Sequence, residues 1–389
     1  MLAVEAFYYF KFQKEYGNRN YTKDLLAQGR YVQSPYAVFE HLPNIVNLKA
    51  DYRNNNMGFR NEEDIAIPKP ANELRVFLFG GSAAHGHGAL GEFAKISGQE
   101  EYASKYTIAA RLEEILHEKI AGKTVRVWSA AVSGYHVHQC YLLYLSKVRC
   151  LQPDLVISID GHNEQFGSEQ DSYNPYLNAR GGWDTHPQRT SLLLRNGMAL
   201  MGKSYALFYL GKELFTTNFF QIDLDQPFDS AFYDYWKAQE PHPHLARLDS
   251  LFKARREKIE KAIDEIIYQY DVFNAVLDCD SVPHVFFSQP LLVLKKHRPP
   301  TEEVLYNYLH SPEFWIEERE LWYRYSYPHL LSEMAHHAQE KKMNWMNLQS
   351  SVDTTHQEIF IDYCHYSKAG NVFLARIIAA FLLKEGLIQ

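Results

Sequence analysis

Three short apolar segments constrain the fold of this chain more than any other feature of its sequence. They cover residues 75–79, 125–131 and 155–159, and each is followed by a glycine or a polar turn. Runs of this length and hydrophobicity are typical of strands that are buried on both faces of a sheet. A fourth run of the same kind, at residues 284–288, is stopped by Pro290.

Helical periodicity separates these segments. Ile108, Leu112, Ile115 and Leu116 recur at the spacing of one helical face and predict a helix over residues 106–120. Further helices are predicted at about 136–149 and 251–273. Strands that alternate with helices in this way predict an α/β fold, in which helices cover a parallel sheet.

Less regular segments precede and interrupt this core. Residues 1–74 contain few helical periods and many turn residues, which predicts an irregular N-terminal extension packed on the core. Residues 75–389 form the main domain, with insertions rich in aromatic residues at about 166–250 and 296–340. We expect the second insertion to be helical and both to roof the crevice of the sheet. A helix from about residue 368 to 384 closes the chain.

The composition excludes some classes of function and location. The chain has 389 residues, with 40 basic against 47 acidic ones and a net charge of −7, so neither nucleic acid nor an anionic membrane is an expected partner. Four scattered cysteines predict either a reducing compartment or free buried thiols, and no disulfide framework or zinc site. The apolar run at the N-terminus is shorter than the ~20 residues that span a bilayer. We therefore expect a soluble protein without a membrane span, cytoplasmic unless an upstream signal has been removed, in which case periplasmic or extracellular.

Four short motifs follow the predicted strands or precede the last helix. The carboxyl ends of parallel strands meet at one edge of a sheet, so we expect these motifs to come together there. A serine hydroxyl, N–H donors for an oxyanion and a histidine oriented by a carboxylate are the parts that nucleophilic acyl chemistry needs. Each motif alone is common in turns, and their order is what indicates an active site. The motifs contribute, in chain order, Ser82, Gly134, Asn163 and the pair Asp362 and His365.

Taken together, these motifs resemble the SGNH hydrolase superfamily, also called GDSL esterases and lipases. The resemblance covers about residues 75–165 and 255–389, and residues 54–60 are similar to a segment that precedes this domain in some members. It implies a flavodoxin-like three-layer α/β/α sandwich and an ester hydrolase that needs neither a metal nor a cofactor. The first motif departs from the family pattern, because Gly80-Gly81-Ser82-Ala83 replaces Gly-Asp-Ser-Leu.

The resemblance also assigns roles to individual residues. It implies that Ser82 is the nucleophile, His365 the base and Asp362 the acid that orients the base. The oxyanion donors would be the backbone N–H groups of Ser82 and Gly134 and the side chain of Asn163. The expected substrate is a small-molecule or glycan ester with an acetyl or short acyl group, and the oligomeric state stays open.

Three other functions share parts of this pattern. The same residues could pass the acyl group to an alcohol, which would make the protein an O-acyltransferase. The aromatic insertions could instead belong to a glycan-binding module without catalytic activity. A metal hydrolase would draw on His85, His87, His136 or His138. The GxGxxG match at residues 86–91 begins six residues after Gly80, too late for a dinucleotide site.

Overall fold

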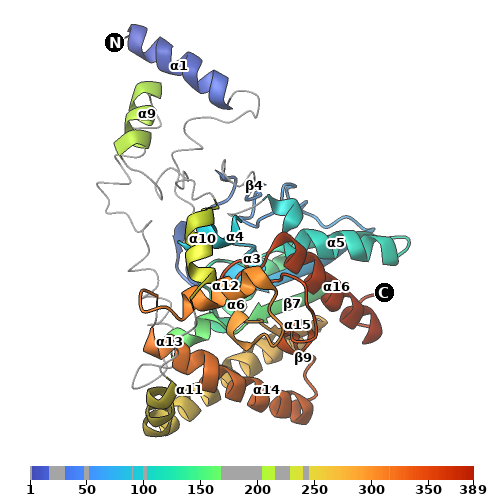
Figure 1. Cartoon of the computed structure of the whole chain (residues 1–389). Helices are drawn as coiled ribbons and strands as arrows, with labels where there is room; N and C mark the ends of the chain where they lie inside the picture. Colours follow the sequence, from blue (N-terminus) through green and yellow to red (C-terminus); the bar gives the residue numbers. More distant parts are fainter. Residues whose placement is uncertain are drawn as a thin grey trace. The chain divides into compact units, whose positions relative to one another are not determined.

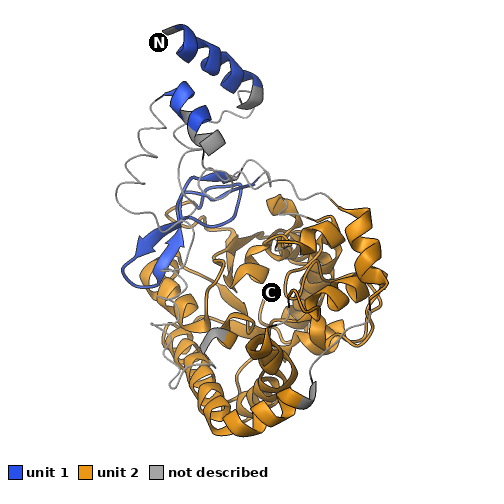
Figure 2. Ribbon diagram, turned by 60° about the vertical axis from the view of Figure 1, so that its left-hand side comes forward, with its two compact units in different colours: residues 1–65, 180–225 blue, residues 66–179, 226–389 orange. Residues whose placement is uncertain are grey.

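A computed structural model describes most of the chain as two compact units. One unit consists of residues 1–65 and 180–225, and the other of residues 66–179 and 226–389 (Figure 2). The larger unit contains every residue of the expected active site. The expectation that residues 1–74 pack on the core stays a prediction. The described residues are 2–16, 31–47, 52–89, 91–99, 103–167, 204–214, 228–239, 245–314 and 316–389.

A five-stranded parallel sheet forms the centre of the larger unit. Its strand order is β6-β5-β7-β8-β9, which is the doubly wound order of flavodoxin-like folds. The strands of the inner positions are almost wholly buried, which explains why they appear in the sequence as continuous apolar runs. The strands are β5 (Glu73–Gly80), β6 (Thr124–Ser129), β7 (Leu155–Asp160), β8 (His284–Ser288) and β9 (Trp345–Asn347).

Helices cover both faces of this sheet (Figure 1). α5 (Ile108–Lys119) packs beside α16 (Lys368–Lys384), and α11 (Leu245–Cys279) packs beside α6 (Val137–Leu143) and α14 (Tyr327–Lys341). α5 lies in the connection from β5 to β6. α6, α11 and α14 lie in the connections from β6 to β7, from β7 to β8 and from β8 to β9, which run in the opposite direction along the sheet. Right-handed crossovers place these two groups on opposite faces. The predicted α/β/α sandwich is confirmed.

The irregular character predicted for the N-terminal residues is wrong in part. α1 (Leu2–Tyr16) is a helix of 15 residues, and two hairpins follow it, β1 (Tyr31–Ser34) with β2 (Val38–His41) and β3 (Val46–Asn47) with β4 (Tyr52–Arg53). The apolar residues of α1 lie on several sides of the helix, so no single stripe marks it in the sequence. Within the same unit, α1 packs beside α9 (Tyr205–Leu214).

The segment 296–340 is helical as predicted, but its last part belongs to the sandwich and is not an insertion. It contains α12 (Pro300–Leu309), α13 (Glu317–Leu321) and α14, and α14 is the crossover between β8 and β9. β9 was not predicted from the sequence, because its three residues are only half-buried and form no apolar run. Of the insertion at 166–250, the described elements are α9, α10 (Ser230–Lys237) and the start of α11, and residues 168–203, 215–227 and 240–244 lie outside the described residues.

Two further expectations concern the whole chain. All four cysteines are free, as predicted; Cys140 and Cys364 are buried, and Cys150 and Cys279 are exposed. Among the described residues, no helix combines the length and the hydrophobicity that crossing a bilayer requires.

Candidate active site

Ser82 lies at the carboxyl edge of the sheet. It begins the one-turn helix α3 (Ser82–His85), directly after β5, and its side chain is half-buried. The strand end is tightly packed against β7, because a Cβ on Gly80 would lie 2.3 Å from the carbonyl oxygen of Ile159. A glycine is therefore needed there, and it holds the serine close to the neighbouring strand. As the first residue of a helix, Ser82 has a backbone N–H without an intrahelical acceptor.

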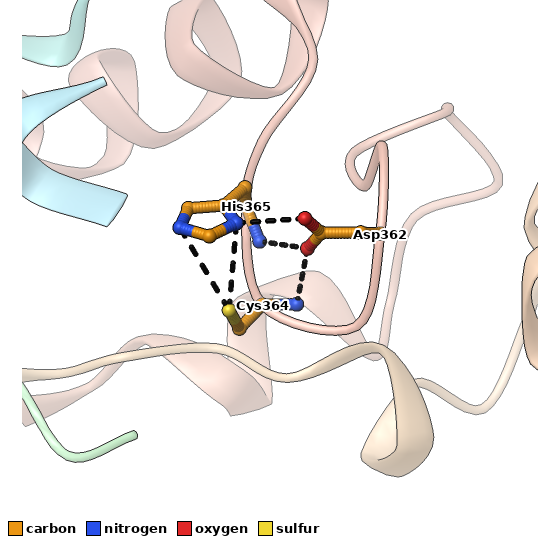
Figure 3. Close-up of side chains that lie close together, drawn as sticks. All are labelled: Asp362, Cys364 and His365. Atoms are coloured by element: carbon orange, nitrogen blue, oxygen red, sulfur yellow. Dashed lines mark hydrogen bonds and ion pairs between the residues drawn. The ribbon is translucent and has the colours of Figure 1, made fainter. Parts of the chain in front are cut away.

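The turn that carries Asp362 and His365 meets this serine. His365 Nε2 lies 2.7 Å from Ser82 Oγ, although 283 positions separate the two residues in the chain. On the other side of the ring, His365 Nδ1 lies 2.7 Å from Asp362 Oδ2 (Figure 3). A bridge between Phe360 and Tyr366 closes the base of the turn. The structure thus brings together the three residues that the sequence analysis singled out as a triad.

Asp362 is fully buried and fully hydrogen-bonded. Its Oδ1 accepts the backbone N–H of Cys364 at 2.8 Å and that of His365 at 2.7 Å, while Oδ2 faces the imidazole (Figure 3). Burial by itself raises the pKa of Asp362, but the charge of His365 and the hydrogen bonds from His365 and the two backbone N–H groups lower it to about 2. The ionised carboxylate keeps the proton of a neutral His365 on Nδ1, so the Nε2 lone pair is directed at Ser82.

Gly134 lies in the turn that follows β6. Its backbone φ is +85°, a value that favours glycine, and the residue is exposed. The turn is tied to the end of β5, because Val132 N donates to Gly80 O at 3.0 Å. No hydrogen bond of the Gly134 N–H is found within the described part of the chain. This N–H is therefore available to a ligand.

Asn163 follows β7, and its amide lies beside the residue that precedes Ser82. A Cβ on Gly81 would lie only 2.4 Å from Asn163 Nδ2. The same nitrogen donates one hydrogen bond to Tyr135 O at 2.7 Å. An amide nitrogen carries two hydrogens, so the second is left for another acceptor. The side chain of Asn163 is 7% exposed, and its position is fixed by the contact with Tyr135.

Glu164 is a residue whose role the sequence did not reveal. Its buried carboxylate accepts Val137 N at 2.9 Å through Oε1 and lies 3.0 Å from His136 Nδ1 through Oε2. It therefore joins the segment that carries Gly134 to the segment that carries Asn163. Asp160, the acidic residue at the end of β7, instead accepts a hydrogen bond from the Ser158 hydroxyl. The sequence signal that could have pointed to Glu164 is its position directly after Asn163.

The donor set of the site does not fit a metal ion. Among the described residues, Asp362, Cys364 and His365 form the only set of three or more acidic, histidine or cysteine groups whose donor atoms all lie within 4.8 Å of one another (Figure 3). The carboxylate already accepts three hydrogen bonds, and burial together with the charge of Asp362 raises the pKa of the Cys364 thiol well above its usual value. A protonated thiol is a poor ligand.

The four histidines considered for a metal hydrolase belong to no group of three or more close donor atoms in the described part of the chain. His85 Nδ1 lies 3.2 Å from Ala131 O, and His87 Nδ1 lies 3.0 Å from Gly88 O. His136 is engaged by Glu164, and the ring of His138 lies 5.6 Å from that of His136. The geometry therefore gives this alternative no support.

Comparison with known proteins places the chain among distant structural neighbours. No family model and no curated protein matches the sequence. Solved structures that resemble it include the acetyl xylan esterase AlAXEase (11% identity, TM-score 0.39, covering 79% of this chain and 98% of the other) and a GDSL-like lipase from Bacteroides thetaiotaomicron (9%, 0.36, 80% and 88%). A catalytic mutant of the acetylxylan esterase Axe2 from Geobacillus stearothermophilus is a third (13%, 0.39, 81% and 96%).

These neighbours are esterases and lipases, and GDSL proteins are among them, which is the family that the motifs resemble. Identities of 13% or less and TM-scores below 0.4 carry no argument about the activity of this chain. The fold of this chain is defined by its own parallel sheet.

Proposed function

We propose that this protein is a serine ester hydrolase that works through an acyl-enzyme. One observation carries the proposal: His365 Nε2 lies 2.7 Å from Ser82 Oγ while its Nδ1 is held by a buried carboxylate at 2.7 Å. A hydroxyl is a weak nucleophile until a base removes its proton, and this arrangement supplies both the base and the group that orients it.

The reaction would proceed in two steps. Ser82 Oγ attacks the carbonyl carbon of the ester as its proton passes to His365 Nε2. The bond to the leaving oxygen then breaks, the proton passes from His365 to that oxygen, and the alcohol departs. A water molecule, deprotonated by His365, attacks the acyl-serine and releases the carboxylic acid and the free serine hydroxyl.

The negative charge of each tetrahedral intermediate falls on the former carbonyl oxygen. In this proposal the N–H groups of Ser82 and Gly134 and the amide of Asn163 stabilise it. The free N–H of Gly134 and the second amide hydrogen of Asn163 support this role, since neither is used within the described structure. Donors fixed before the reaction stabilise developing charge most effectively, because they need no reorganisation.

The substrate class that we propose is a small-molecule or glycan ester with an acetyl or short acyl group. Aromatic side chains gather next to the turn of Asp362 and His365, as ligand pockets commonly require. A series of 4-nitrophenyl esters from acetate to decanoate would measure the preferred acyl length. The aromatic residues in this group are Phe93, Tyr308, Phe314, Tyr323 and Tyr363.

Covalent labelling tests the nucleophile directly. A fluorophosphonate should modify the protein once, and peptide mapping should place the label on Ser82. Ser82→Ala should abolish both labelling and ester hydrolysis, whereas Ser350→Ala, which alters an exposed serine in α15 (Leu348–Val352), should change neither. Absence of the label, or a label on another residue, would overturn the proposal and favour a glycan-binding module without catalysis.

Transfer to an alcohol is the second candidate, because the same three residues would form the same acyl-enzyme. Hydrolysis of 4-nitrophenyl acetate in the presence of a sugar alcohol separates the two. If most of the acetyl group appears on the added alcohol and little as acetate, the protein is an O-acyltransferase.

A further inference from the structure

Arg319 is a buried cation that has no anionic partner among the residues the structure describes. Arg319 is 7% exposed, and its guanidinium forms no ion pair with any carboxylate in the described residues. Its Nη2 donates to Phe314 O at 2.6 Å, and its Nε is buried without a hydrogen-bond partner. The guanidinium carbon lies 4.2 Å from the ring centre of Phe314 and 5.3 Å from that of Tyr363.

The nearby acidic residues do not neutralise this charge. Glu317 pairs with Arg247, and Glu320 lies 3.2 Å from both Arg324 and His310. An arginine stays protonated in a protein, and a buried charge without a partner is strongly unfavourable. The two aromatic rings offset part of this cost. The unused Nε–H still lacks an acceptor, which a bound anion would supply.

Arg319 lies beside the proposed active site. Tyr363, whose ring it contacts, stands between Asp362 and His365 in the same turn. The ring of Tyr363 also lies 5.4 Å from that of His162, the residue before Asn163. Burial is the largest cause that lowers the pKa of His162 to about 3, and the charge of Arg319 contributes to it. The guanidinium therefore acts on both segments that flank Ser82.

We propose that Arg319 binds a carboxylate group of the substrate, so that this enzyme prefers esters that are negatively charged close to the scissile bond. The inference rests on the proposed ester hydrolase activity. A planar guanidinium matches a carboxylate in a two-pronged hydrogen bond. The neighbouring Arg324 is committed to Glu320, so one positive charge is available here, which suits a monoanion better than a phosphate dianion.

The carboxylate of the substrate belongs either to its acyl group or to its alcohol, and matched pairs of charged and neutral esters distinguish these two cases. If it belongs to the acyl group, the 4-nitrophenyl monoester of succinic acid should be hydrolysed faster than 4-nitrophenyl butyrate. If it belongs to the alcohol, an acetylated methyl glucuronoside should lose acetate faster than the corresponding methyl glucoside. A charged hydrogen bond corresponds to a preference of about ten- to a hundredfold in kcat/KM. Equal rates within both pairs would overturn the inference.

Variants locate the preference at Arg319. Arg319→Met should remove the preference, so that the ratio of kcat/KM for the charged ester to kcat/KM for its neutral counterpart falls to about one. Arg319→Lys should retain part of it, because the charge remains but the planar fork is lost. Arg247→Met, which removes an exposed arginine that pairs with α13, should leave the preference intact. An equal loss for both esters in Arg319→Met would contradict the inference.

The wild-type protein provides a test that does not depend on the stability of a variant. Either glucuronate or succinate, according to which part of the substrate carries the carboxylate, should inhibit hydrolysis of a neutral ester competitively, and glucose at the same concentration should not. Inhibition by neither carboxylate, or equal inhibition by glucose, would overturn the inference. A wild-type protein that hydrolyses no ester and is not labelled by a fluorophosphonate would instead refute the proposed function itself.

Discussion

At the scale of single residues, much of the order in this site depends on one carboxylate. Asp362 accepts two backbone N–H groups of its own turn and also fixes the imidazole of His365. Because the same side chain shapes the turn and orients the base, the geometry of the base follows from the local fold. The hydrogen bonds within the short DxxH segment therefore orient His365 independently of its contact with Ser82.

Asn163→Ala tests the proposed oxyanion site at this scale. Loss of one oxyanion donor typically costs about 3 kcal/mol, or roughly a hundredfold in kcat. We expect KM to change little, because the interaction strengthens only as charge develops. Steady-state kinetics with 4-nitrophenyl acetate measures both constants, and a wild-type kcat in this variant would remove Asn163 from the mechanism.

At the scale of elements, buried side chains hold the active-site segments in register. Glu164 links the turn after β6 to the turn after β7, and it does so from a position that is 1% exposed. The buried pair of Lys295 and Glu302 supports the approach to the Asp362 turn, because Glu302 also accepts the backbone N–H groups of Ile359 and Phe360 at 2.6 and 2.9 Å.

Glu164→Gln should lower activity by weakening this link. The amide keeps the size of the side chain but replaces one acceptor oxygen by a donor, so either Val137 N loses its acceptor or the His136 ring must take the tautomer in which Nδ1 accepts. If Glu164 positions the oxyanion donors, kcat should fall about tenfold, the equivalent of 1.4 kcal/mol, while KM stays within a factor of two. Circular dichroism and thermal melting serve as the control for folding. A fall in melting temperature without a fall in kcat would assign Glu164 a purely structural role.

Lys295→Met should destabilise the fold, because it leaves Glu302 buried without its cation. Breaking a buried ion pair in this way costs about 3–5 kcal/mol. Chemical denaturation measures the loss, and Lys296→Met offers a matched control, since the side chain of Lys296 is 72% exposed. We expect the control to change the free energy of unfolding by less than about 0.5 kcal/mol. Similar losses in both variants would show that the buried pair has no special role.

At the scale of the whole molecule, buried titratable groups couple stability to pH. Burial lowers the pKa of His138 to about 3, with the charge of His136 as a second cause. Burial raises the pKa of Asp160 to about 7, and the charge of Glu164 adds to that effect. The two groups act in opposite directions. Between about pH 4 and 6 the unfolded chain protonates His138, whereas the folded chain retains a proton on Asp160.

The contribution of His138 has a definite sign. Below its ordinary pKa of 6.5 the unfolded state binds a proton that the folded state does not, so stability falls as the pH is lowered toward 3. His138→Phe removes this contribution. The slope of the free energy of unfolding against pH should therefore be lower in the variant by about 1.4 kcal/mol per pH unit between pH 4 and 6, because the opposite contribution of Asp160 is no longer offset. Parallel curves for wild type and variant, from urea denaturation across this range, would show that His138 does not titrate as described.

The sequence by itself predicted the features that depend on local interactions. Runs such as residues 75–79 and 155–159 marked the inner strands because burial on both faces leaves no room for polar side chains. The order of the motifs after those strands predicted which residues meet, since parallel strands end at one edge. By contrast, the helix α1 and the short edge strand β9 have no clear periodicity and were missed.

Only the tertiary structure decided the contacts between distant parts of the larger unit. The 2.7 Å approach of His365 to Ser82 spans 283 positions, and the placement of Arg319 beside Tyr363 brings α13 against the turn of Asp362. The carboxylate of Glu164 meets its partners 27 and 28 positions earlier in the chain. Such contacts leave no periodic trace in the sequence, because they depend on how whole elements pack and not on the preferences of neighbouring residues.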